Sequence, residues 1–134
     1  MEGNTFSPSY LTQMALYFCH LILDVSEKNI MLQGNTFLGY VEPEQYGAFR
    51  SKLIADEARL KKGQISLHFV PMETTLLPHH GVEISGELVS YVGSKRVTQS
   101  VETYRLQFAP KMGRLFIRSF ETLKTTRQGG DDGS

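Results

Sequence analysis

The first stretch of the chain repeats apolar positions with the period of an α-helix. Ser7-Pro8 supplies an N-cap followed by a proline at the first helical position. Apolar residues then recur three and four positions apart in two neighbouring stripes. The first stripe is Leu11, Met14, Ala15, Phe18 and Ile22, and the second is Tyr10, Tyr17 and Leu21. This pattern predicts a helix that either lies buried between a sheet and other helices or meets another protein with part of its surface.

A second helix is predicted in the next segment. Asp24 and Glu27 have the spacing of a capping box, with Ser26 as a competing cap, so we expect the helix to begin there. It is expected to end at about Tyr40. Its apolar side is formed by Ile30, Phe37, Leu38 and Val41.

A third helix begins at Glu42-Pro43-Glu44, where a proline suits the first turn and acids suit the positive end of the helix dipole. Lys61-Lys62-Gly63 closes this helix. Charged residues fall mostly on its outer side. The residues expected to face inward are Tyr46, Phe49, Leu53, Ile54 and Leu60.

From Gln64 onward the apolar period changes to two, which is typical of half-buried strands. The first strand is expected to run irregularly past Pro71, which must lie at a bulge or an edge. The apolar face changes parity after Gly86, which predicts a bulge or sharp bend there. The predicted strands are 65–77, 82–91, 96–108 and 114–124, separated by short turns. The sequence therefore predicts an α+β fold with three helices on one face of a curved four-stranded antiparallel sheet.

The composition of the chain limits which kinds of partner and site this domain can have. The 134 residues suit one domain, and 14 basic against 14 acidic residues give a formal net charge of zero. A phosphate-binding domain normally carries a basic surplus, so the balance argues against nucleic acid as the main partner. The single cysteine, Cys19, excludes an internal disulfide and reads as a small core residue. The most apolar stretch, 11–23, is too short to span a membrane.

No motif in the sequence indicates catalysis. His79-His80 reads as a loop pair, because no cysteine or carboxylate lies nearby at the spacing of metal ligands. Glu83 and Glu87 are four apart in a strand, and cross-strand pairing with Arg96 and Arg105 explains them. We therefore expect no enzyme activity and no catalytic, metal-binding or cofactor-binding residue.

The alternative function is a small-ligand-binding or enzymatic domain that uses the concave side of the sheet as a pocket. Such a pocket needs a polar group aimed into an apolar cavity. The inward candidates are His68, Glu83 and Glu102, and they form no convergent set.

Aromatic content favours a protein interface instead. Eight Phe and six Tyr in a chain of this length exceed what one small core easily encloses, and tyrosine is enriched at protein interfaces. The candidate interface residues lie on the predicted first and third helices. They are Tyr10, Gln13, Tyr17, Arg50 and Arg59.

An ordered set of short motifs resembles the TraE family of conjugative type IV secretion, over nearly all of residues 5–124. Each motif is weak alone, and their order and spacing carry the resemblance. They are Phe6-Ser7-Pro8-Ser9-Tyr10-Leu11, Ala15-Leu16-Tyr17-Phe18, Tyr40-Val41-Glu42-Pro43-Glu44-Gln45-Tyr46-Gly47, Ile65-Ser66 with Phe69-Val70-Pro71, and Gly86-Glu87-Leu88-Val89-Ser90-Tyr91-Val92-Gly93 followed by Thr103-Tyr104-Arg105-Leu106.

The resemblance implies a scaffold subunit of the inner-membrane complex that acts in plasmid or mobile-element DNA transfer through protein contacts. It implies a nuclear-transport-factor-2-like fold in a single periplasmic domain, residues 6–125. The small and polar residues at the two ends, without periodicity, predict a disordered or tag-derived tail at 1–5 and a disordered tail at 126–134. The resemblance also implies a membrane anchor that this sequence does not include, and other secretion subunits as partners.

One motif of the wider group differs in this sequence. Related assembly components often carry an Asn-Pro-x-Gly turn before the last strand, and that turn is associated with dimer contacts. Ala109-Pro110-Lys111-Met112-Gly113 stands in its place, without the Asn and one residue longer. We therefore expect the isolated domain to form only a weak homo-oligomer, which the membrane helix would strengthen by raising the effective concentration.

Overall fold

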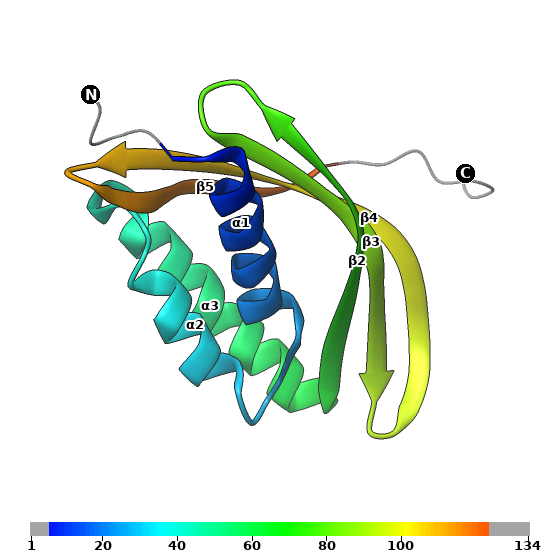
Figure 1. Cartoon of the computed structure of the whole chain (residues 1–134). Coiled ribbons are helices and arrows are strands. Elements are labelled where there is room, and N and C mark those ends of the chain that lie inside the picture. The colour runs from blue at the N-terminus through cyan, green and yellow to red at the C-terminus, as the bar shows by residue number, and fades with distance from the viewer. Residues whose placement is uncertain (1–5, 124–134) are drawn as a thin grey trace.

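In a computed structural model, which describes residues 6–123, three helices lie on the concave side of a strongly curved antiparallel sheet (Figure 1). The α+β class is confirmed. The predicted tails at 1–5 and 126–134 and residues 124 and 125 lie outside the described part of the chain. The elements are α1 (Pro8–Leu23), β1 (Val25–Ser26), α2 (Ile30–Leu38), α3 (Pro43–Gly63), β2 (Ile65–Leu77), β3 (Gly81–Val92), β4 (Lys95–Lys111) and β5 (Arg114–Leu123).

The sheet has five strands in the order β1-β2-β3-β4-β5, so the expected count of four was one short. The additional strand β1 has two residues, Val25 and Ser26, which pair with Leu67 and Ser66. These two residues were predicted to lie at the start of the second helix. That helix begins at Ile30 instead, because the segment before it is held against β2.

The side chain of Asp24 helps to hold this segment. Its Oδ1 accepts a hydrogen bond from the backbone N–H of Phe69 at 2.7 Å. The same carboxylate lies 2.9 Å from the ring Nδ1 of His68 and 2.6 Å from that of His20. Asp24 therefore joins the end of α1 to β2, and the predicted capping box with Glu27 does not form.

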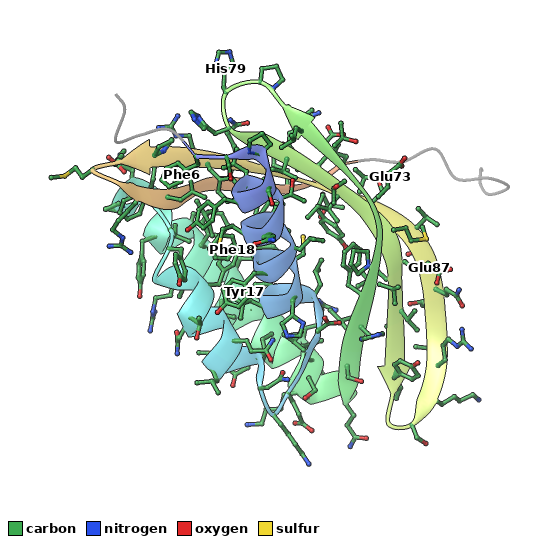
Figure 2. The ribbon with its side chains drawn as sticks, in the orientation of Figure 1. Phe6, Tyr17, Phe18, Glu73, His79 and Glu87 are labelled. Carbon is green, nitrogen blue, oxygen red and sulfur yellow. The ribbon has the colours of Figure 1, made fainter. Side chains whose placement is uncertain are left out.

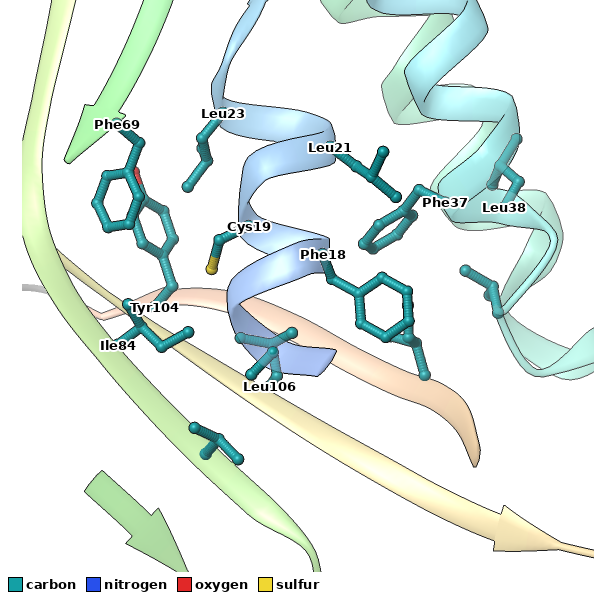
Figure 3. Close-up of a cluster of buried hydrophobic side chains, with 14 of the residues drawn as sticks. Phe18, Cys19, Leu21, Leu23, Phe37, Leu38, Phe69, Ile84, Tyr104 and Leu106 are labelled. Atoms are coloured by element: carbon teal, nitrogen blue, oxygen red, sulfur yellow. The ribbon is translucent and has the colours of Figure 1, made fainter. Parts of the chain in front are cut away.

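Helix α1 packs most deeply into the core. Phe18 is fully buried, and its ring centroid lies 5.9 Å from those of Phe37 and Phe108 (Figure 3). Cys19 beside it is also buried, and this burial raises the pKa of its thiol to about 12. Cys19 is therefore the core residue that the sequence predicted, in a form that reacts poorly as a nucleophile.

Helix α3 has the predicted bounds but packs less deeply. Leu53 and Leu60 are buried, and Phe49 is half-buried. The inward assignment of Tyr46 and Ile54 was wrong, since their side chains are 43% and 42% exposed. The reason is that α3 lies at the margin of the helical layer, where its contacts are with α2 and the start of β2.

The sheet bends where β2 passes Gly86. The pairing register shifts between Pro71 and Glu73, so the bulge lies on β2, and Pro71 lies at its edge as expected. A Cβ atom on Gly86 would lie 2.3 Å from the carbonyl oxygen of Val70, so the close approach of the two strands requires glycine. The bend was thus predicted at the right place but on the wrong strand.

Candidate interaction surface

One side of α1 is exposed and carries three of the five nominated residues. Tyr10, Gln13 and Tyr17 are spaced three and four apart, which puts them on one helix face. The two tyrosine side chains are each 40% exposed. The opposite face of α1 contributes buried residues to the core, Phe18 among them, so neighbouring positions serve opposite roles (Figure 2).

The exposed face begins with an ordered aromatic pair. The ring of Phe6 stacks on that of Tyr10, with centroids 5.4 Å apart and planes 17° from parallel. Ser7 caps the helix by accepting a hydrogen bond from the backbone N–H of Tyr10 at 3.1 Å. The ring of Tyr10 is therefore held by its stacking on Phe6, and its backbone is held by the Ser7 cap.

The two candidate interface arginines, Arg50 and Arg59, do not lie together in the structure. Arg50 and Arg59 are nine residues apart on α3, about two and a half turns, so they lie on opposite sides of the helix. Arg59 lines a cavity under the helices, where its Nη2 lies 3.8 Å from Oδ1 of Asp56. Neither arginine shares an element with the exposed face of α1.

Sequence reasoning missed a buried carboxylate at the start of α3. Glu42 is 4% exposed, and Arg118 donates to its two oxygens at 3.1 and 3.2 Å. The Nζ of Lys111 lies 2.9 Å from one of them. Hydrogen bonds from Arg118, and then from Lys111, lower the pKa of the Glu42 carboxyl. In the sequence these three charged residues are far apart, and nothing in their spacing indicates that they meet. Only the fold brings Lys111 of β4 and Arg118 of β5 to Glu42 at the start of α3.

Backbone bonds at the same place join the α2–α3 connection to the edge of the sheet. The N–H of Glu42 donates to the carbonyl of Ile117, and the N–H of Ile117 donates to that of Tyr40, at 3.0 and 2.7 Å. These bonds cover part of the β5 edge, which limits unwanted edge pairing there. The turn beyond it consists of Met112 and Gly113, both with positive φ, while Pro110 and Lys111 belong to β4.

Other polar residues that the sequence singled out lie in cross-strand pairs and at turns. Arg105 pairs with Glu83 at 2.8 Å across β3 and β4, as the cross-strand interpretation expected. His79 lies at the tip of the β2–β3 hairpin, far from the helices (Figure 2). Within residues 6–123, no group of three or more metal-ligating side chains occurs. No helix in the described part of the chain is long and apolar enough to cross a membrane.

A cavity of about 290 Å³ lies between the helices and the concave side of the sheet. Its walls are mostly apolar, and its charged residues are Lys52, Asp56 and Arg59 from α3. The inward candidates His68, Glu83 and Glu102 do not line it, and they form no convergent set there. These three candidates lie on strands of the sheet, whereas the charged residues at the cavity lie on α3. The sequence predicted the bounds of α3 but not its position against the sheet.

Helices packed on the concave side of a curled antiparallel sheet define the nuclear-transport-factor-2-like class, and solved secretion proteins share this fold. A TraE protein solved in complex with 2-(2-furyl)isonicotinic acid superposes with a TM-score of 0.73 at 11% identity, over 90% of this chain and 99% of that one. VirB8 of Agrobacterium tumefaciens gives 0.73 at 10% identity, over 93% and 99%. An IcmL-like type IV secretion system protein of Legionella pneumophila gives 0.62 at 15%, over 87% and 94%.

The sequence itself matches the TraE protein family over residues 1–122, so the chain belongs to the TraE family. Protein TraE of Escherichia coli K12 is 27% identical over 121 residues, which cover 90% of this chain and 64% of that protein. The chain therefore spans about two thirds of the length of this relative. The resemblance to the TraE family that was inferred from the motifs is confirmed.

Proposed function

We propose that this chain is a structural subunit of the inner-membrane complex of a conjugative type IV secretion system. It acts in the transfer of plasmid or mobile-element DNA by holding other subunits in place, without chemistry of its own. Membership of the TraE family supports this role, and so does the likeness of its fold to VirB8. Its neutral charge fits protein partners better than the transported DNA.

The observation that carries the proposal is the exposed face of α1. A helix that anchors the core on one side presents Tyr10 and Tyr17 on the other, with 40% of each side chain exposed. Tyrosine offers a large apolar area and a hydrogen-bonding tip at low entropic cost, which suits a protein interface. We assign the contact with other secretion subunits to this face, with Gln13 between the two rings as a polar partner.

The proposed setting is the periplasmic side of the inner membrane, with residues 6–125 forming the domain and a membrane segment supplied elsewhere in the full-length protein. Weak contacts between copies would then act at the raised effective concentration of a membrane. Sedimentation of the 134-residue chain should show a monomer at micromolar concentration. A dimer that persists at nanomolar concentration would contradict weak self-association.

A mating assay with the full-length protein tests the interface. Tyr10→Ser with Tyr17→Ser should reduce transfer by tenfold or more, on the order expected when interface anchors are removed. Tyr46→Ser is the matched control, because Tyr46 is 43% exposed on α3 and should leave transfer unchanged. Equal transfer by both variants at normal protein levels would overturn the assignment. Thermal unfolding of the isolated chain checks that both variants keep the fold.

A further inference from the structure

Three parts of the chain that are far apart in sequence meet at one end of the molecule, where α3 passes into β2 (Figure 1). Ser26 of β1 pairs with Ser66 of β2. The backbone N–H of Gly93, in the β3–β4 turn, donates to the carbonyl of Gln64 at 3.2 Å. The segments that these contacts hold side by side are 26–29, 61–66 and 92–96.

Each of the three segments contributes cations to this end. The cations, which are all exposed and together form the surface that we call the basic end, are Lys28, Lys61, Lys62, Lys95 and Arg96. Glu27 is the one acidic residue in the same segments. Arg96 reaches a further carboxylate, that of Glu87, only through Gln99, which accepts from Arg96 at 2.6 Å and donates to Glu87 at 2.7 Å. Within residues 6–123, no salt bridge neutralises any of the five cations.

Cations elsewhere in the described part of the chain have a different role. Five of them lie 2.8–3.8 Å from a carboxylate oxygen, and these are Lys52, Arg59, Arg105, Lys111 and Arg118. At the basic end, Lys61 and Lys62 offset the negative end of the α3 dipole. Lys28, however, lies just before the positive end of α2, where a cation is unfavourable. Grouping five like charges also costs repulsion, so the basic end is suited to an anion from outside the domain.

The distribution of charge over the whole chain limits the size of that anion. The basic end holds five of the 14 basic residues and one of the 14 acidic ones, so the rest of the chain has nine basic and thirteen acidic residues. A long polyanion such as DNA would reach beyond the basic end and meet this acidic surplus. A short acidic segment that covers only the basic end avoids it.

We propose that the basic end docks a short segment of a partner protein that is rich in Asp or Glu. The carboxylates of that segment pair with the five cations, so complementary charge selects the partner and speeds its approach. The basic end lies beyond the last turn of α3, whereas Tyr10 and Tyr17 lie on the first three turns of α1. This contact therefore goes beyond the scaffold contact assigned to α1 and does not depend on it.

Fluorescence anisotropy of a labelled octaglutamate peptide, titrated with the 134-residue chain, tests the proposal. We expect saturable binding with a dissociation constant on the order of 10–100 µM in about 20 mM salt, and at least about tenfold weaker binding in about 150 mM salt, because salt screens exposed ion pairs. An octapeptide of alternating Gln and Ser, which lacks the charge, should not bind. Octathymidylate should bind more weakly than octaglutamate. Absence of saturable octaglutamate binding, or equal or tighter binding of either comparison probe, would overturn the proposal.

Two double variants locate the binding on the basic end. Lys61→Gln with Lys62→Gln should weaken octaglutamate binding by at least about fivefold, since two exposed ion pairs are lost. Lys95→Gln with Arg96→Gln should weaken it by a similar factor, because the β3–β4 turn contributes to the same surface. A variant of either pair that binds octaglutamate as tightly as the wild type would contradict the site.

The matched control is Arg50→Gln with Lys52→Gln. It removes the same charge from exposed positions of the same helix, about 15 Å before the basic end at 1.5 Å per residue. It should change the dissociation constant by less than about twofold, and weakening equal to that of the other variants would show a general charge effect and overturn the site. All three variants change exposed side chains, so their melting temperatures should stay within a few degrees of the wild type.

Discussion

Helices α1 and α3 cover the same concave sheet but pack in different ways. Of the 16 residues of α1, six are buried, including Phe18 and Cys19. Of the 21 residues of α3, two are buried, Leu53 and Leu60. Helix α1 lies over the centre of the sheet, whereas α3 lies at its margin with a cavity beside it (Figure 1). The helix that fixes the core is thus different from the helix that borders the cavity.

Because α1 and α3 pack differently, the residues that stabilise the fold differ from the surfaces that are open to other molecules. A partner surface can lie on the outer face of α1 because the inner face already holds that helix in place. A cavity can form beside α3 because fewer of its side chains are needed to fill the interior. The predictions below test this division, from the largest expected effect to the smallest.

Phe18→Ala should lower the free energy of unfolding by about 3–5 kcal/mol, since it empties the most crowded part of the core. Phe49→Ala removes the same atoms from α3 but from a half-buried position at the cavity wall, and should cost less than half as much. Urea unfolding of the two variants measures both. Equal losses would show that α3 is packed as tightly as α1.

Gly86→Ala should destabilise the sheet by about 1–3 kcal/mol, because the new methyl group would be forced against the backbone of β2. Gly47→Ala is the control, since a Cβ at Gly47 on α3 meets nothing within 4 Å. It should stabilise the protein by about 0.5–1 kcal/mol through helix propensity. Thermal melts distinguish the two, and a neutral Gly86→Ala would contradict the required close approach.

Glu42→Gln should lower the melting temperature by a few degrees at pH 7 and have a smaller effect in acid. The pKa of Glu42 is lowered in the folded protein by Arg118 and Lys111, so its stabilising contribution is present above its ordinary value of 4.5. That contribution is lost as the pH falls through the folded pKa. The melting curves of wild type and variant should therefore converge below pH 4.5. A constant difference from pH 7 to pH 3 would contradict the ion-pair role.

Local patterns predicted much of the fold. The N-cap of α1, the proline start of α3 and the period-two strands depend on residues close in sequence, so their positions could be read directly. Strand β1 could not, because Val25 and Ser26 join the sheet only when Asp24 contacts Phe69 on a distant strand.

The candidate sites also divide into those set by residues close in sequence and those set by distant contacts. The face of Tyr10, Gln13 and Tyr17 follows from helical spacing alone, so the sequence could group it. The cavity depends on how α3 lies against the sheet, and Glu42 depends on three elements meeting. No spacing along the chain encodes these arrangements.

Photo-crosslinking in mating donor cells tests the central claim most directly. A photoreactive phenylalanine analogue would replace Tyr17 of α1 in the full-length protein, and in a second strain it would replace Tyr46 of α3, which is about equally exposed. We predict that position 17 captures another secretion subunit or a second copy of this chain, and that position 46 captures far less. Equal capture at both positions, or none at position 17 in cells that transfer DNA, would contradict the assignment of the outer face of α1 to the assembly.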